Sequence, residues 1–338
     1  MHDVDFIIRR IQFCLACVWI ILIFFGLMLV ALADPEIFKP VKETKNQFAF
    51  AEQKSNTGFW TPPDSTTIPE TPEGKLIRYG YNLVAHTSLH LGPQGKVMQA
   101  TNGMNCQNCH LKAGTKIYGN NYSAVASTYP KFRERSGTIE SIEKRVNDCV
   151  ERSLNGNALN ENSEEMRAFV AYIKWVGSNV PKGTSPKGVG LMVPDFLDRP
   201  ADPKKGFMVY QEFCIRCHGS NGQGQKSDNR VEWKYPPLYG NECYNVGAGL
   251  FRLSRFAGYI KANMPNDVAT FEKPALTDEQ AWDVAAYINS MPRPGKDISA
   301  DWPDISRKPV DHPFGPYADN FSETQHKYGP FKEMTRKN

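Results

Sequence analysis

Two copies of one five-residue motif, one in each half of the chain, predict an all-α fold made of two class I cytochrome c domains in tandem. The motif is Cys-x-x-Cys-His, and it occurs at Cys106–His110 and at Cys214–His218. Each copy lies in a segment with helical patterning. A long apolar run close to the N-terminus adds a transmembrane or signal helix ahead of the two domains.

The chemistry of the motif predicts two covalently bound haem c groups. The two thiols add across the haem vinyl groups, and the adjacent His becomes the proximal iron ligand. The attachment residues would be Cys106, Cys109 and His110 in the first domain and Cys214, Cys217 and His218 in the second. A pair of thioredoxin-like or zinc-binding dithiols is the alternative, but nothing in the sequence completes a four-ligand zinc site.

Length and composition narrow the function classes. The chain has 338 residues, enough for two domains of ordinary size. Its formal net charge is +4, and no Lys/Arg-rich run with interleaved aromatic residues occurs, so nucleic acid is not an expected partner. Of the eight cysteines, those outside the two motifs are Cys14, Cys17, Cys149 and Cys243. Val18 follows Cys17 where a His would be needed, so this pair is no third haem site.

The apolar run covers residues 11–33 and follows Arg9 and Arg10. As a helix it would be about 34 Å long, against a hydrocarbon core of about 30 Å. The basic residues ahead of it keep the N-terminus cytoplasmic. Because haem is attached outside the cytoplasm, we expect the protein on the periplasmic side of the bacterial inner membrane, anchored by this run. Ala31-Leu32-Ala33 also fits a cleavage site, so a cleaved and soluble protein is the alternative.

Composition shifts divide the chain into five segments. Residues rich in Pro, Thr and Asn follow the apolar run, and a Pro- and Gly-rich stretch at 180–188 separates the two halves. Beyond Pro292 the chain carries repeated prolines and aromatics, which we expect to pack over the haem domains or against a partner. The segments are a signal-anchor or signal peptide at 1–33, a linker at 34–70, the first cytochrome c domain at 71–185, the second at 186–295 and a C-terminal tail at 296–338.

Capping signals predict where the main helices begin. Thr71 followed by Pro72 starts a helix that ends near His86 or later. If that helix continues, His86 and His90 share a face, and one of them could be a haem ligand rather than a residue with local hydrogen bonds. The other predicted helices cover 138–154 with Thr138 as cap, start near Ser163, cover 202–213, and start at Thr277 with a capping box.

Comparing the two halves predicts the distal haem ligands. In the second half Met264 precedes Pro265, which favours an extended loop conformation suited to a thioether ligand. About the same distance ahead of the last helix of the first half stands Cys149. We therefore expect Met264 on the second haem and Cys149 on the first.

The neighbours of Cys149 predict an anion site. Arg145, Cys149 and Ser153 recur at every fourth position and would lie along one helix face. A nearby Arg favours the thiolate, and Ser153 can donate a hydrogen bond to sulfur or to a bound group. Arg135, slightly upstream, would add a second positive charge.

Other roles for Cys149 stay open at this point. It could be an inert buried thiol, or it could form a disulfide with Cys243. In that case Met98 or Met104 could ligate the first haem, or the iron could lack a distal protein ligand.

Several of these segments resemble the dihaem thiosulfate dehydrogenases. The resemblance covers about residues 71–295 and rests on Tyr129–Gly137, Arg145–Gly156, Glu165-Met166, Tyr172–Trp175, Pro236–Gly240, Gly247–Gly249 and Asn263–Pro265. It implies coupling of two thiosulfates to tetrathionate at a His/Cys-ligated haem, with a His/Met-ligated second haem that passes electrons on. It also implies Cys149 as distal ligand and reactive sulfur, and Arg135, Arg145 and Ser153 as substrate-site residues.

Two function classes remain, together with a weaker third. The first is an enzyme, a thiosulfate dehydrogenase or the reverse tetrathionate reductase, with a small cytochrome c or a terminal oxidase as electron acceptor. A thiolate ligand would lower the reduction potential of the first haem, and a Met ligand would raise that of the second. This difference would favour electron transfer from the first haem to the second. The second is a membrane-anchored dihaem electron-transfer subunit of a respiratory complex, without substrate chemistry. The third is a sulfur-carrier cytochrome.

Overall fold

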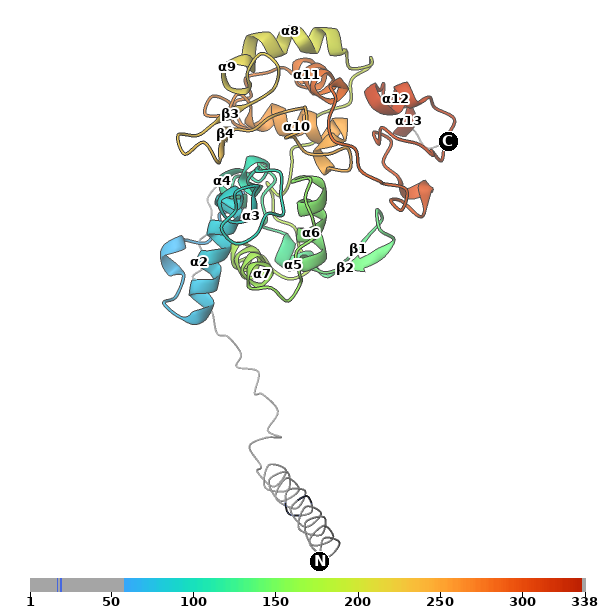
Figure 1. The fold of residues 1–338 in the computed structure, drawn as a ribbon. Helices are drawn as coiled ribbons and strands as arrows, with labels where there is room; N and C mark the ends of the chain where they lie inside the picture. The colour runs from blue at the N-terminus through green and yellow to red at the C-terminus, as the bar shows by residue number, and fades with distance from the viewer. Residues whose placement is uncertain (1–16, 18, 20–57, 336–338) are drawn as a thin grey trace, which may run out of the picture. The chain divides into compact units, whose positions relative to one another are not determined.

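The computed structural model describes residues 17, 19 and 58–335 (Figure 1). The predicted anchor at 11–33 and most of the predicted linker at 34–70 therefore lie outside the described residues. Within the described part, no helix is both long enough and apolar enough to cross a membrane. The end of the predicted linker packs against the first domain, where the Trp60 indole donates to the Asn179 side chain at 3.0 Å.

The first domain is built on two long helices that cross at small residues. Thr71 and Ser163 cap their N-termini through side-chain oxygens, as predicted. A Cβ on Gly80 would lie 2.0 Å from the carbonyl oxygen of Ala168, so only glycine permits this approach. The elements are η1 (Ser65–Thr67), α2 (Pro72–Ala85), α3 (Thr87–Leu91), η2 (Cys106–Asn108), α4 (Leu111–Gly114), α5 (Val125–Thr128), α6 (Ile142–Arg152) and α7 (Glu164–Val176), and α2 crosses α7.

The second domain repeats this crossing. A Cβ on Gly206 would lie 1.9 Å from the carbonyl oxygen of Asp283, which corresponds to the Gly80 contact of the first domain. The predicted capping box of Thr277 and Gln280 is confirmed. The helices are α8 (Pro203–Phe213), α9 (Ile215–His218), η3 (Gly249–Phe251), α10 (Leu253–Asn263) and α11 (Asp278–Ser290), and α11 packs against both α8 and α10.

Two short hairpins correct the expectation of an all-α fold. Strands β1 (Lys131–Arg133) and β2 (Thr138–Glu140) pair antiparallel, as do β3 (Gln225–Lys226) and β4 (Trp233–Tyr235). The described part of the chain is thus mostly helical rather than entirely so.

The first hairpin also shows that the predicted start of the helix at 138–154 is wrong. Thr138 belongs to β2, and Ser141 caps α6 by accepting a hydrogen bond from the Lys144 amide at 3.1 Å. Gly137 turns the chain with a φ of +66°, which favours glycine, and lets the β-branched Thr138 and Ile139 pair with β1.

The C-terminal tail packs on both domains. Its elements are η4 (Ile305–Arg307), α12 (Glu323–Tyr328) and α13 (Lys332–Thr335). On the second domain, Phe331 is buried, with its ring 5.7 Å from that of Trp282. On the first domain, the Trp302 amide donates to the carbonyl oxygen of Arg135 at 2.7 Å. The tail is therefore part of the folded unit to which residues 58–335 belong.

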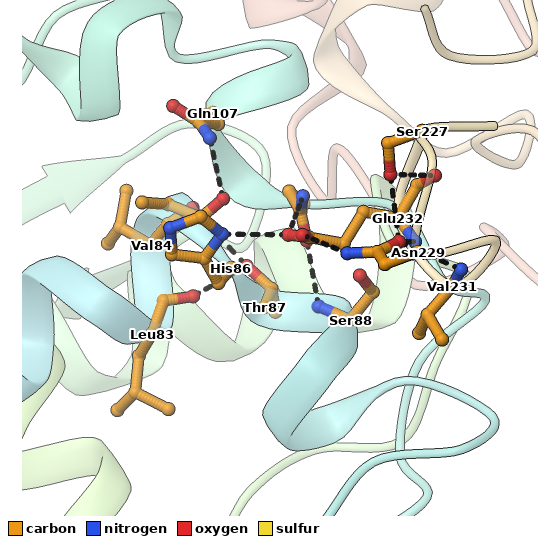
Figure 2. Close-up of polar contacts among 12 residues, drawn as sticks. Leu83, Val84, His86, Thr87, Ser88, Gln107, Ser227, Asn229, Val231 and Glu232 are labelled. Carbon is orange, nitrogen blue, oxygen red and sulfur yellow. Dashed lines mark hydrogen bonds and ion pairs between the residues drawn. The ribbon is translucent and has the colours of Figure 1, made fainter. Parts of the chain in front are cut away.

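A carboxylate from the second domain joins the two domains beside the first motif. Glu232, just before β4, accepts hydrogen bonds from His86 Nδ1 at 2.8 Å and from Asn105 Nδ2 at 3.0 Å. Figure 2 shows Asn229 supporting the same carboxylate from the second domain. The helix does not continue through His86, which separates α2 from α3, so His86 and His90 do not share one helix face as considered above.

Candidate haem and substrate sites

The first motif is folded so that His110 has Nδ1 on a backbone carbonyl and only a long contact at Nε2, which lies 3.4 Å from Asn120 Nδ2. Asn105 and Asn108 cap the turn of η2 reciprocally, and the Thr87 hydroxyl accepts from the Cys106 amide at 2.9 Å. His110 Nδ1 lies 2.6 Å from the carbonyl oxygen of Asn120. Because a carbonyl only accepts, Nδ1 carries the proton and Nε2 keeps its lone pair. Burial lowers the pKa of His110 to about 4, which keeps the ring neutral, as a metal ligand must be.

The second motif repeats this arrangement beside a cavity. His218 Nδ1 donates to the carbonyl oxygen of Pro236 at 2.9 Å, and burial lowers its pKa. Met264 ends α10 in an extended conformation, with φ of −120° and ψ of 142°, as Pro265 predicted. The cavity has a volume of about 650 Å³, and its lining includes Cys214, Cys217, His218 and Met264. One imidazole, one thioether and two thiols on one apolar cavity fit the donor set of a His/Met haem c.

The first motif also forms part of the wall of the cavity beside the second motif. Asn108 and Cys109 both line it. Tyr259, on α10, donates its hydroxyl to the carbonyl oxygen of Asn108 at 3.0 Å. Met104 is buried against Cys106 and Cys109 and lines the same cavity. Residues of both motifs therefore line this one cavity.

Cys149 lies on the third turn of α6, half-buried and close to the first motif. Burial raises the pKa of Cys106 and of Cys109 to about 12, and the charge of Cys149 adds to both shifts. Its sulfur is therefore within electrostatic range of both attachment cysteines. Cys149 and Cys243 are free thiols, so the structure does not contain the alternative disulfide between them.

The guanidinium groups of Arg145 and Arg152 lie within electrostatic range of that of Arg135, and Arg145 is the one that interacts with Cys149. Arg145 lies one turn before it, and the thiolate of Cys149 is the main cause that raises the pKa of Arg145. Arg135 lies in the turn between β1 and β2. Burial, followed by the charges of Arg152 and Arg145, lowers the pKa of Arg135 to about 10. Like charges that depress a guanidinium pKa create a place where an anion binds favourably.

The predicted residues do not all take part in the same way. Ser153 is the C-cap of α6, and its amide donates to the carbonyl oxygen of Cys149 at 2.8 Å. Arg135 Nη1 donates to the carbonyl oxygen of Gly247 at 3.3 Å, while its buried Nε has no hydrogen-bond partner. Arg135, Arg145 and Cys149 are thus brought together, and Ser153 lies one turn further along α6.

Sequence reasoning missed Arg152 and its partner in the tail. Arg152 forms a two-pronged ion pair with Asp301, with both N–O distances 2.7 Å. No spacing rule connects residues so far apart in the chain. The only available signal was that Arg152 is the residue before Ser153 on α6. Within the described residues, no group of three or more His, Cys, Asp or Glu side chains is placed to hold a metal ion.

Comparisons with protein families match each half separately. The family model described as "SoxA/TsdA, cytochrome c domain" matches residues 96–181. The model described as "Cytochrome C oxidase, cbb3-type, subunit III" matches residues 201–288. Two cytochrome c domains imply that the chain binds haem c.

Whole-chain comparisons point to one kind of enzyme. A thiosulfate dehydrogenase of Psychrobacter arcticus is 37% identical over 244 residues, which is 71% of each chain. One of Allochromatium vinosum is 33% identical over 251 residues, or 73% of this chain and 88% of the relative. A solved thiosulfate dehydrogenase (TsdBA) from Marichromatium purpuratum superposes with a TM-score of 0.63 at 30% identity, over 77% of this chain. The chain spans about half of that solved chain, 53% of its length.

Proposed function

The chain belongs to the thiosulfate dehydrogenase family, and we propose that it oxidises thiosulfate to tetrathionate at its first domain and passes the electrons through its second. As a dihaem cytochrome c, it would hold two covalently bound haem c groups. His110 and Cys149 would be the axial ligands in the first domain, and His218 and Met264 those in the second. When bound, the two haems accept one electron each.

The observation that carries this proposal is the pair of Arg145 and Cys149 on successive turns of α6, beside the first motif, with the Arg135 guanidinium within electrostatic range of Arg145. Two thiosulfate dianions repel each other, so joining them needs fixed positive charge. Guanidinium groups supply it as preorganised donors. A site with two cations and one polarisable sulfur suits the joining of two sulfur anions better than simple electron transfer does.

The chemistry of Cys149 can be written so that atoms and electrons balance. The Cys149 thiolate forms a sulfur–sulfur bond with the terminal sulfur of one thiosulfate, and two electrons leave. The terminal sulfur of the second thiosulfate then attacks the outer sulfur of that bond. Tetrathionate departs and the Cys149 thiolate is regenerated. Arg135 and Arg145 bind the sulfonate groups, and the Ser153 hydroxyl donates to the bound anion. The same steps in reverse reduce tetrathionate.

The remaining parts of the proposal concern the surroundings of the enzyme. We place it on the periplasmic side of the inner membrane, because haem attachment occurs outside the cytoplasm and residues 11–33 are apolar enough to anchor it. Removal of that segment would give a soluble periplasmic form. The electron acceptor would be a small cytochrome c or a terminal oxidase that approaches the second domain.

An electron-transfer subunit without substrate chemistry is the second candidate. It is favoured by the match of residues 201–288 to subunit III of a cbb3-type oxidase. It does not account for the arginines around Cys149. The two candidates differ in whether thiosulfate alone reduces the protein.

The deciding experiment is low-temperature EPR of the oxidised wild type and of Cys149→Met, with thiosulfate-dependent reduction followed in the same samples. We expect a thiolate-ligated low-spin signal in the wild type, and we expect the variant to lose both this signal and reduction by thiosulfate. Cys243→Ser is the matched control, because Cys243 is a buried free thiol on the second domain. A wild type that shows only His/Met haems, unchanged by the Cys149 substitution, would favour the electron-transfer subunit.

A further inference from the structure

Two consecutive residues of the C-terminal tail, Asp301 and Trp302, contact the arginines near the first motif. Asp301 contacts Arg152, and Trp302 contacts Arg135. The Asp301 carboxylate binds both terminal nitrogens of Arg152, and the two side chains are only 9% and 13% exposed. A bidentate pair of this kind fixes the orientation of a guanidinium as well as its charge. Arg152 is therefore neutralised and held by the tail.

Trp302 holds the neighbouring arginine from the other side. Its amide donates to the carbonyl oxygen of Arg135 at 2.7 Å. Its ring lies 6.0 Å from the Arg135 guanidinium, at the outer limit of a cation–π contact. Trp302 is buried and has a φ of +63°, a conformation that a bulky residue adopts only when its surroundings hold it there.

The hairpin turn and the tail fit closely beside this contact. A Cβ on Gly137 would lie 2.7 Å from Cγ of Pro303, the residue after Trp302. The turn that carries Arg135 therefore packs directly on the tail. Because Gly137 and Pro303 pack tightly beside Arg135, the tail affects the position of the Arg135 side chain.

We propose that Asp301 and Trp302 are positioning residues of the thiosulfate site: Trp302 holds Arg135 in place for the substrate, and Asp301 withholds Arg152 from it. This inference rests on the proposed function. The first part follows because Arg135 has one side-chain bond, to the Gly247 carbonyl oxygen, and a buried Nε without a partner, so the tail is needed to orient it.

The second part follows from charge. The site must bind two dianions and then release one dianion, tetrathionate. Arg135 and Arg145 supply two positive charges beside the Cys149 thiolate. A third free guanidinium at Arg152 would strengthen substrate and product binding alike, and tight product binding slows release. Asp301 removes that third charge from the site.

Substitutions at Trp302 and at Asp301 should therefore change the affinity of the site for anions in opposite directions. Trp302→Ala keeps the amide bond to Arg135 but removes the ring beside its guanidinium. The KM for thiosulfate should therefore rise about tenfold with a smaller change in kcat, and Trp302→Phe should restore most of the loss. Asp301→Asn releases Arg152, so the KM should fall roughly threefold and inhibition by tetrathionate should strengthen. Calorimetric titration of the oxidised holoprotein with tetrathionate should show the same pair of signs without turnover.

Controls separate positioning from folding. Asp304→Asn changes an exposed tail carboxylate that contacts Ser306 and Arg307, and it should leave both constants unchanged. If both site variants weaken tetrathionate binding, or if neither changes it, the inference is overturned while the proposed function stands. If wild type is not reduced by thiosulfate, the proposed function fails first. Should Trp302→Ala not fold, Trp302→Phe and Asp301→Asn still decide the outcome.

Discussion

Arg145 and Cys149 occupy successive turns of α6, and the thiolate of Cys149 favours the charged form of Arg145. The thiolate raises the pKa of Arg145, so this guanidinium stays protonated at any pH at which the protein is folded. A permanent positive charge one turn from a thiolate is a strong donor for an incoming dianion. At the scale of single residues, this pair is the centre of the proposed chemistry.

Arg145→Ala should lower kcat/KM for thiosulfate by about 100-fold, because it removes a charged donor to the anion. Arg145→Lys should recover part of the loss. Steady-state reduction of the holoprotein by thiosulfate measures both. Arg167→Ala, which removes an exposed guanidinium on α7, serves as the control. Equal activity of Arg145→Ala and wild type would contradict the proposed substrate site.

Met264 allows a second test at this scale. A thioether ligand raises the potential of a haem, so Met264→Ala should lower the midpoint potential of the second haem by on the order of 0.1 V. Redox titration followed by optical spectroscopy measures the shift. Met291→Ala is the matched control, since Met291 ends α11 in the same domain but does not line the cavity. An unchanged potential in Met264→Ala would show that another group ligates the iron.

At the scale of elements, helix α6 is positioned by its cap and by the hairpin before it. Ser141 caps the helix, whereas Thr138 is paired in β2. Ser141→Ala should therefore lower the free energy of unfolding by about 1 kcal/mol, which corresponds to a fall in Tm of about 3 °C for a unit of this size.

Thr138→Ala is the informative comparison, because the sequence pattern predicts Thr138 as the N-cap of this helix. Its side chain is exposed and shares a hydrogen bond only with Ser136. We expect its Tm to change by less than about 1 °C. Thermal unfolding of the two variants side by side gives the answer, and a larger loss in Thr138→Ala would favour the longer helix.

The contrast between these two residues shows what local patterns can predict. Thr71, Ser163 and Thr277 were predicted correctly as caps, because each hydroxyl is followed at once by a good helix start. At Thr138 two starts lie three residues apart, and pairing with β1 decides between them. Local capping rules do not contain that information, since it depends on the turn at Gly137.

At the scale of the whole molecule, long-range ion pairs hold the parts together. Glu232 joins the second domain to His86 and Asn105 of the first. Arg152 and Asp301 join α6 to the tail. The two motifs, their helices and the sulfur at Cys149 could be predicted from spacing along the chain. The contacts of Glu232 and the pair of Arg152 and Asp301 could not be predicted, because spacing along the chain does not show which loops meet after folding.

The Glu232 contact predicts a pH dependence of stability. Partial burial pushes the pKa of Glu232 upward, but hydrogen bonds from His86, Asn229 and Asn105 outweigh it, so its pKa lies below the usual 4.5. A carboxyl group with a lowered pKa stabilises the fold above its unfolded-state value and loses that contribution as the pH falls through the folded-state value. The contact should therefore be at full strength at neutral pH.

We expect Glu232→Gln to lower the free energy of unfolding by about 1 kcal/mol near neutral pH. The difference from wild type should shrink as the pH falls below the usual carboxyl pKa of 4.5 and through the lower folded-state pKa of Glu232, because the carboxylate of the wild type is then protonated as well. Denaturant unfolding across that range measures the difference. Glu242→Gln alters an exposed carboxylate in the same domain and should show no such trend. A gap that persists at acid pH would mean that packing, not charge, accounts for it.

The hydrogen bond from the Tyr259 hydroxyl to the Asn108 carbonyl oxygen limits how the two halves of the chain can change in evolution. The peptide that would carry one haem is also a lining of the chamber for the other. A foreign cytochrome module grafted in place of residues 201–288 would lack that fitted partner, and its haem chamber would open to solvent. The two halves, although each matches a family model of its own, are therefore constrained to change together.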